Sequence, residues 1–164
     1  MKKHVFIVFF LLLTSTMSAQ DIISDFMSEV EDDSECVTIS LSGKMLRMSA
    51  ANDPSVNQDF KKLINNIDKI KLVTNISINS DDKKRLKKLL QPFEELMVVS
   101  ESEQKISMYT KEKKGKITEF VLCIEFDDNL VLMNISGNID IKQLSKLSSA
   151  LKINGMEHLE KLNK

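Results

Sequence analysis

The second half of the chain changes from a helical to a strand period, and this change limits the possible folds more than any other feature. From Leu96 onward, apolar and polar residues alternate in four consecutive segments. The segments cover residues 96–101, 105–111, 117–126 and 130–136. Short polar connections separate them, and short connections join sequential strands as antiparallel neighbours. The sequence therefore predicts an antiparallel meander of four strands.

The first half of the chain mixes helical and strand patterns. Apolar spacings of three and four predict helices over residues 21–33, 60–70 and 80–93, and a short helix is expected over 44–51. Alternation predicts two strands, over residues 37–41 and 72–78.

The boundaries of these elements also have sequence signals. Ser80 is the expected N-cap of the helix at 80–93, and Pro92 is expected to end or kink this helix. After the meander, Asp140 is expected to cap a last helix that carries Leu144, Leu147 and Leu151 on one face. Together these elements predict an α+β fold, with a mostly antiparallel sheet of about five to six strands and helices packed on one face.

The N-terminus has the pattern of a cleavable secretory signal. Lys2 and Lys3 precede an unbroken apolar run over residues 5–13, and the small residues Ser18 and Ala19 follow it. The run is too short to span a bilayer, which needs roughly 20 apolar residues. We therefore expect residues 1–19 to be a signal peptide and residues 20–164 to form a single exported domain.

Two stretches resemble a known bacterial family. The segment Leu-Met-Asn-Ile-Ser-Gly-Asn-Ile-Asp at 132–140, followed by Leu144 and Leu147, is similar to the end of that family's sequences. The segment Val-Thr-Ile-Ser at 37–40, followed by Lys-Met-Leu at 44–46, is similar to its first strand and short helix. The family is the exported one of Bacteroidetes filed as domain of unknown function 4252.

This resemblance implies a Gram-negative envelope protein that is periplasmic or associated with the outer membrane. Genes of the family often lie near genes for extracytoplasmic sigma factors and anti-sigma factors, which suggests a link to envelope stress signalling. The family has no established catalytic residues, so the resemblance assigns none here.

Few residues of the types that carry catalysis or bind metals are present. The chain has two histidines, His4 and His158, and the first belongs to the predicted signal. Two cysteines cannot complete a cysteine-rich zinc site, and four scattered glycines form no phosphate-binding loop. The acidic residues 127–128 and the pair Glu101 and Glu103 are expected in turns. We therefore predict no enzyme activity, no metal and no cofactor.

The run Lys83, Lys84, Arg85, Lys87 and Lys88 is the most basic helical segment. Its residues are expected on an exposed helix face, which could attract anionic lipid or an acidic partner, or could simply keep the domain soluble. The whole chain has 23 basic and 24 acidic residues. This balance argues against nucleic acid as the partner.

The two cysteines, Cys36 and Cys123, are each out of phase with the apolar residues of their strands. Both thiols are therefore expected on the face opposite the main apolar one. In an oxidising compartment they could form a disulfide, provided that the first strand lies beside the strand at 117–126. The alternative is two unpaired, half-buried thiols.

Two functions remain open from the sequence. The first is a non-catalytic exported module that acts through an envelope protein partner. The second is a peripheral binder of lipid or another amphiphile, which would use the sheet face and the basic helix.

Overall fold

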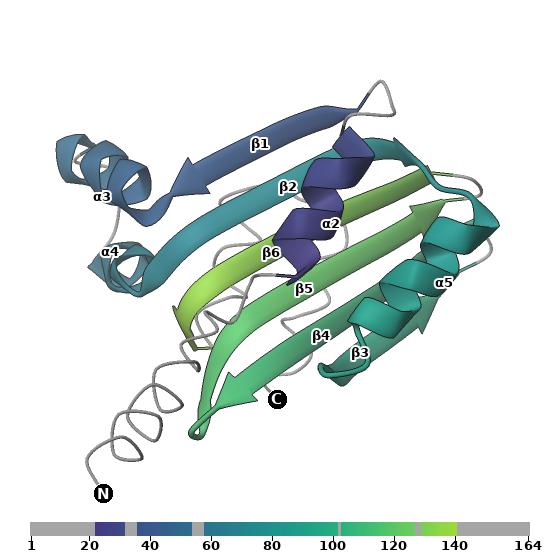
Figure 1. Cartoon of the computed structure of the whole chain (residues 1–164). Helices are drawn as coiled ribbons and strands as arrows, with labels where there is room; N and C mark the ends of the chain where they lie inside the picture. The colour runs from purple at the N-terminus through teal and green to yellow at the C-terminus, as the bar shows by residue number, and fades with distance from the viewer. Residues whose placement is uncertain (1–21, 32–35, 54–57, 102, 127–128, 141–164) are drawn as a thin grey trace, which may run out of the picture.

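The computed structural model describes residues 22–31, 36–53, 58–101, 103–126 and 129–140, which form a six-stranded antiparallel sheet with four helices (Figure 1). The elements are α2 (Ile22–Glu31), β1 (Val37–Ser42), α3 (Gly43–Asn52), α4 (Gln58–Asn65), β2 (Ile67–Ser77), α5 (Ser80–Leu89), β3 (Glu94–Ser100), β4 (Lys105–Lys113), β5 (Lys116–Phe126) and β6 (Asn129–Ile139). The strand order is β1-β2-β6-β5-β4-β3. The predicted α+β fold class is confirmed.

The meander from β3 to β6 is confirmed in order and direction, because each of these strands pairs with the next along the chain. The connection between β4 and β5 shows why the chain reverses there. Lys114 and Gly115 both have positive φ, at 55° and 72°. Two such residues form the turn whose twist matches that of the flanking strands, and glycine adopts this conformation without strain.

The predicted helix over residues 60–70 is wrong in its second half. Helix α4 ends at Asn65, and β2 begins at Ile67. The carbonyl of Asn66 accepts a hydrogen bond of 2.8 Å from the backbone N–H of Asn138, next to Gly137. A side chain at Gly137 would collide with that same carbonyl. Pairing with β6 therefore overrides the helical spacing of the isoleucines.

Helix α5 also begins one residue earlier than the sequence indicated. Its N-cap is Asn79 and not Ser80, because the Asn79 side chain accepts hydrogen bonds from the backbone N–H groups of Asp81 and Asp82. The side chain of Asp82 returns to the backbone of Asn79, which completes a capping box. The helix ends at Leu89, before Pro92, as expected.

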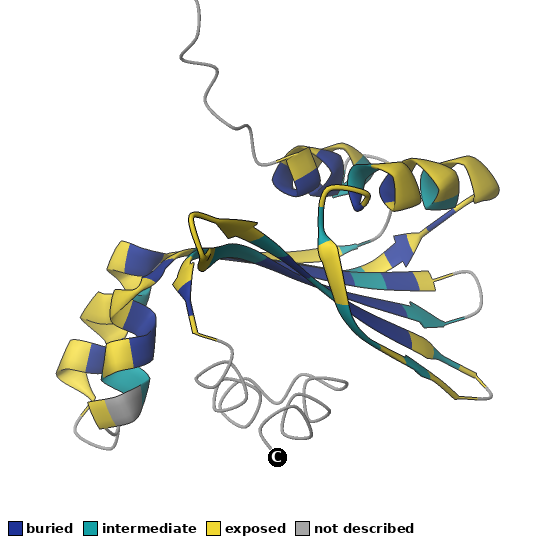
Figure 2. Ribbon diagram, turned by 90° about the horizontal axis from the view of Figure 1, so that it is seen from below, coloured by how far each residue is buried: buried dark blue, intermediate teal, exposed yellow. Residues whose placement is uncertain are grey.

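Both faces of the sheet carry buried apolar residues. Helices α2 and α5 cover one face (Figure 2), where Phe26 and Leu86 pack against strand residues such as Val121 and Leu130. On the opposite face a second cluster surrounds Phe120, and α4 contributes Leu63 to it. Figure 1 places α3 and α4 together beyond one end of β1 and β2.

Several predictions fall on residues that the structure does not describe. These are the signal peptide at 1–19, the last helix with Leu144, Leu147 and Leu151, the acidic pair at 127–128, and both histidines. Within the described residues, no helix combines the length and the apolar character needed to cross a membrane.

Candidate functional site

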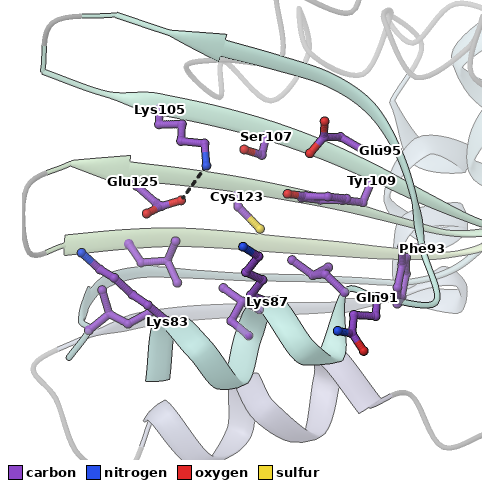
Figure 3. A pocket seen from close by; sticks show the side chains of 14 residues that line it. Lys83, Lys87, Gln91, Phe93, Glu95, Lys105, Ser107, Tyr109, Cys123 and Glu125 are labelled. Atoms are coloured by element: carbon purple, nitrogen blue, oxygen red, sulfur yellow. Dashed lines mark ion pairs between the residues drawn. The ribbon is translucent and has the colours of Figure 1, made fainter. Parts of the chain in front are cut away.

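A cleft of about 510 Å³ lies between α5 and strands β3, β4 and β5, on the face that the helices cover (Figure 3). Leu86 of α5, Leu90 at the C-cap of α5, and Leu130 of β6 form its apolar floor. The remaining lining residues are Ile78, Lys83, Lys87, Gln91, Phe93, Glu95, Lys105, Ser107, Tyr109, Cys123 and Glu125. The cleft falls within the volume range of small-molecule sites.

Two small side chains beneath α5 explain why space remains there. Ser107 of β4 and Cys123 of β5 are direct cross-strand partners, and both line the cleft. Large apolar residues at this pair would fill the volume under the helix. Two positions further along, on the same face of the sheet, Lys105 and Glu125 are cross-strand partners that line the cleft and remain exposed to solvent.

Charged side chains surround the opening. Lys83 and Lys87 extend from α5 toward the strands (Figure 3). Lys105 and Glu125 form an ion pair whose nitrogen and oxygen are 3.9 Å apart, and both side chains are well exposed. Such a pair contributes little to stability and leaves Lys105 able to change partner. With Glu95, the rim has three lysines and two glutamates.

Besides these charged residues, the strand side of the cleft carries three uncharged polar side chains, those of Ser107, Tyr109 and Cys123. Burial raises the pKa of Tyr109, an effect that the nearby Ser107 hydroxyl partly offsets. Burial also raises the pKa of the Cys123 thiol to about 12, and Glu125 adds to this shift. The Ser107 hydroxyl is buried beside Tyr109 without a well-aligned hydrogen bond to any described residue. Since only a thiolate is a strong nucleophile, Cys123 is poorly suited to covalent catalysis.

The basic side chains of α5, which were predicted to share one exposed face, point in different directions. Arg85 points toward α2, where it pairs with Glu29 and lies 5.4 Å from the centre of the Phe26 ring. Lys84 forms an exposed ion pair with Asp81 at 2.9 Å. Arg85 therefore helps to join the two helices, and the five basic residues do not form one continuous contact face.

The three remaining lysines of the run differ in whether they line the cleft. Lys83 and Lys87 line the cleft, whereas Lys88 is exposed and does not line it. Among the described residues, neither Lys87 nor Lys88 has an ion-pair partner. Lys87 is thus a cleft cation available to a ligand, and Lys88 is its natural comparison.

The strand arrangement that a Cys36–Cys123 disulfide requires is absent. The expectation that both thiols share one face is confirmed, because both contact the apolar cluster beneath α2 and α5. The expectation that the first strand adjoins the strand at 117–126 is wrong, because β2 and β6 lie between β1 and β5. Neighbouring strands are about 4.8 Å apart, so three steps exceed the reach of a disulfide. Both cysteines are free.

A buried ion pair beneath α2 escaped the sequence analysis. Lys71 of β2 is buried, and its Nζ lies 2.6 Å from Glu31 and 2.7 Å from the hydroxyl of Ser28. The signal was the alternation of Lys69 and Lys71 with Ile70, which the predicted helix concealed. Had residues 67–71 been assigned to a strand, Lys69 and Lys71 would have been placed together on one face, which is the face that α2 covers.

The cleft residues of β4 were also missed, although their signal is visible. Lys105, Ser107 and Tyr109 alternate with Ile106 and Met108, so they form the polar side of a strand whose other side is apolar. A polar row of this kind is usually exposed, and only the position of α5 above it makes a site. Within the described residues, no group of three or more His, Cys, Asp and Glu could hold a metal ion.

Comparison with known proteins gives one match. No curated protein and no solved structure matches the chain. A family model, described as a domain of unknown function (DUF4252), matches residues 27–147, which include every described strand. The chain therefore belongs to the family of domain of unknown function 4252.

Proposed function

We propose that this domain is a non-catalytic binding protein of the cell envelope that holds an amphiphile with an anionic head group in the α5 cleft. The observation that supports this function is the joining of an apolar floor to a rim with more lysines than glutamates. A site for a neutral or fully polar ligand would not need both features.

The ligand's apolar part would contact Leu86, Leu90 and Leu130, replacing water on the floor of the cleft. The head group would lie near Lys87, and it would accept charge-assisted hydrogen bonds from the Lys87 ammonium, which would orient the ligand. The Ser107 hydroxyl, buried without a well-aligned partner, supplies one more donor at the strand side. A fatty acid or a lysophospholipid has this combination of groups.

The test is a titration with a fluorescent acyl chain that ends in a carboxylate, with the alcohol of equal length as a comparison. The protein should bind the carboxylate saturably and more tightly than the alcohol. Lys87→Glu should raise the Kd for the carboxylate roughly tenfold, which corresponds to a loss of about 1.4 kcal/mol of binding free energy. The matched control, Lys88→Glu, should leave it unchanged, because Lys88 does not line the cleft.

Two outcomes would contradict the proposal. Equal losses in Lys87→Glu and Lys88→Glu would indicate general attraction to a basic helix. Binding that never saturates, or that is equal for the carboxylate and the alcohol, would remove the head-group role of Lys87.

The envelope location is part of the proposal and has its own test. The apolar run at 5–13 and the Ser18-Ala19-Gln20 boundary support export. Mass spectrometry of protein recovered from the envelope fraction should find a chain that begins at or near Gln20. An intact Met1 on that protein would exclude cleavage.

A protein-interaction module is the second candidate function. Its support is the position of exposed apolar residues: of six large ones among the described residues, four lie in β1 and α3. They are Val37, Ile39, Met45 and Met48. Capture of envelope proteins by the native chain, and loss of that capture in Met45→Gln/Met48→Gln, would support a role in envelope signalling.

A further inference from the structure

The two edges of the sheet differ in their protection against further strand pairing. β1 and β3 are the outer strands, so each has one row of backbone groups without a strand partner. β3 begins with Glu94 and Glu95, and its register with β4 shifts after Glu95. Charges and bulges of this kind prevent a sheet from adding another strand.

β1 has none of these features. Its sequence, Val-Thr-Ile-Ser-Leu-Ser, contains no charge, no proline and no glycine. Its six residues pair with β2 in one unbroken register, so the strand has no bulge. Figure 1 shows β1 at the border of the sheet, with no described strand or helix alongside its outer edge. An edge that is regular, uncharged and exposed is suited to accept a strand.

The side chains of β1 form two uniform rows. Val37, Ile39 and Leu41 share the face opposite α2 and α5, as their partners Leu72 and Ile70 show. The residues between them all carry hydroxyl groups, at Thr38, Ser40 and Ser42. Val37 and Ile39 remain 56% and 46% exposed, although both are β-branched residues that favour pairing.

We propose that the occupant of this edge is a second copy of the chain, which pairs its own β1 antiparallel to the first. The twofold axis would be perpendicular to the sheet, so each face continues into the same face of the copy. With Ile39 opposite Ile39 of the copy, Val37 meets Leu41 and Thr38 meets Ser40. Apolar residues then pair with apolar ones, and hydroxyl-bearing residues pair with one another.

This self-matching pattern favours a second copy over an unlike strand. A strand that selects a different partner commonly uses charges to reject its own copy, and β1 has no charge for that purpose. The pairing also leaves the cleft free, because the cleft lies near β3, β4 and β5, toward the edge of the sheet opposite β1. The inference thus gives the protein-contact candidate a defined partner and does not depend on ligand binding.

The experiment is sedimentation velocity of the whole protein across a concentration series. The wild type should show a reversible dimer. Ile39→Lys and Ile39→Glu should each weaken dimerisation at least tenfold, because each brings like charges together at the twofold axis. An equal mixture of the two variants should restore dimers, since the opposite charges then meet. Val98→Lys, on the exposed face of the protected edge strand β3, is the matched control and should dimerise like the wild type.

Each outcome decides the proposal. A wild type that remains monomeric throughout the series would overturn it, even if the chain captured another envelope protein by the same edge. Dimers that persist in both Ile39 variants, or that are lost equally in Val98→Lys, would place the interface elsewhere. If Ile39→Lys binds the acyl carboxylate as tightly as the wild type, the variant is folded. A loss of dimers in that variant then concerns the β1 edge alone and leaves the cleft proposal untouched.

Discussion

Lys71 and Glu31 form an ion pair whose two side chains are buried to different extents, so removing one partner should cost more stability than removing the other. Lys71 is the one charged residue that is buried among the described residues. Its side chain is 7% exposed, whereas that of Glu31 is 26% exposed. The ammonium therefore depends on Glu31 and Ser28 for solvation, while the carboxylate could still turn toward water.

This inequality fixes the expected cost of removing each partner. Glu31→Ala leaves the buried ammonium with only the hydroxyl of Ser28 as a partner at bonding distance. Breaking a fully buried pair costs about 3–5 kcal/mol, and the partial exposure of Glu31 reduces our expectation to about 2–4 kcal/mol. Lys71→Met removes the buried charge and keeps most of the side-chain volume. Its expected cost is about 0–1 kcal/mol, since Glu31 can then reach solvent.

Urea denaturation of both variants and of the double variant measures these costs as changes in the free energy of unfolding. The dependence of that free energy on urea should stay constant, because the folded surface is the same. The double variant should be about as stable as Lys71→Met alone. If Lys71→Met proved as damaging as Glu31→Ala, the cost would come from the Coulomb attraction of the pair and not from stranding a buried charge.

Four further predictions concern the core, the thiols and the helix cap. Phe120→Ala should cost about 3–5 kcal/mol because Phe120 is fully buried, and Phe93→Ala should cost about 1–2 kcal/mol because Phe93 is half-buried at the cleft; equal costs in urea melts would contradict this difference. A thiol reagent at pH 8 should label Cys36 in the native protein and reach Cys123 only after denaturation, as peptide mapping can show. The folded pKa of Cys123, about 12, exceeds the unfolded value, so the contribution of this thiol to stability is complete below the unfolded pKa and is lost as the pH rises from about 9 toward 12. Over this pH range the melting temperature of Cys123→Ala should therefore decrease less steeply with pH than that of the wild type. Asn79→Ala should cost about 0.5–2 kcal/mol through loss of the α5 cap, while Ser80→Ala should cost less.

Local patterns predicted the meander well because its strands pair with their neighbours along the chain. The alternation at residues 105–111 and 117–126 fixes which side chains share a face, and the short turn at Lys114 and Gly115 fixes the partner. The opposite phases of Phe120 and Cys123 were predicted for the same reason and are confirmed. In these segments, local preference and the final fold agree.

Prediction failed where a distant segment decides the outcome. The spacing of Ile67 and Ile70 suits a helix, yet residues near Gly137 pair with this stretch and make it a strand. The same pairing inserts β6 between β2 and β5, which separates β1 from β5 and removes the basis for a disulfide. Periodicity reports the face on which a residue lies, but it carries no information about which strand is the next neighbour.

The candidate site combines both situations, and this explains why only half of it was predicted. The sequence predicted a basic helix with a buried stripe that includes Leu86 and Leu90, but it assigned Lys83 and Lys87 to the exposed face together with the other basic residues. What lies opposite them depends on the strand order, which brings the small pair Ser107 and Cys123 beneath this helix. A bulky pair there would bury the same two lysines' aliphatic stems and leave no cleft. The basic helix thus becomes a candidate binding element through its partner strands, and its charge alone did not distinguish Lys87 from Lys88.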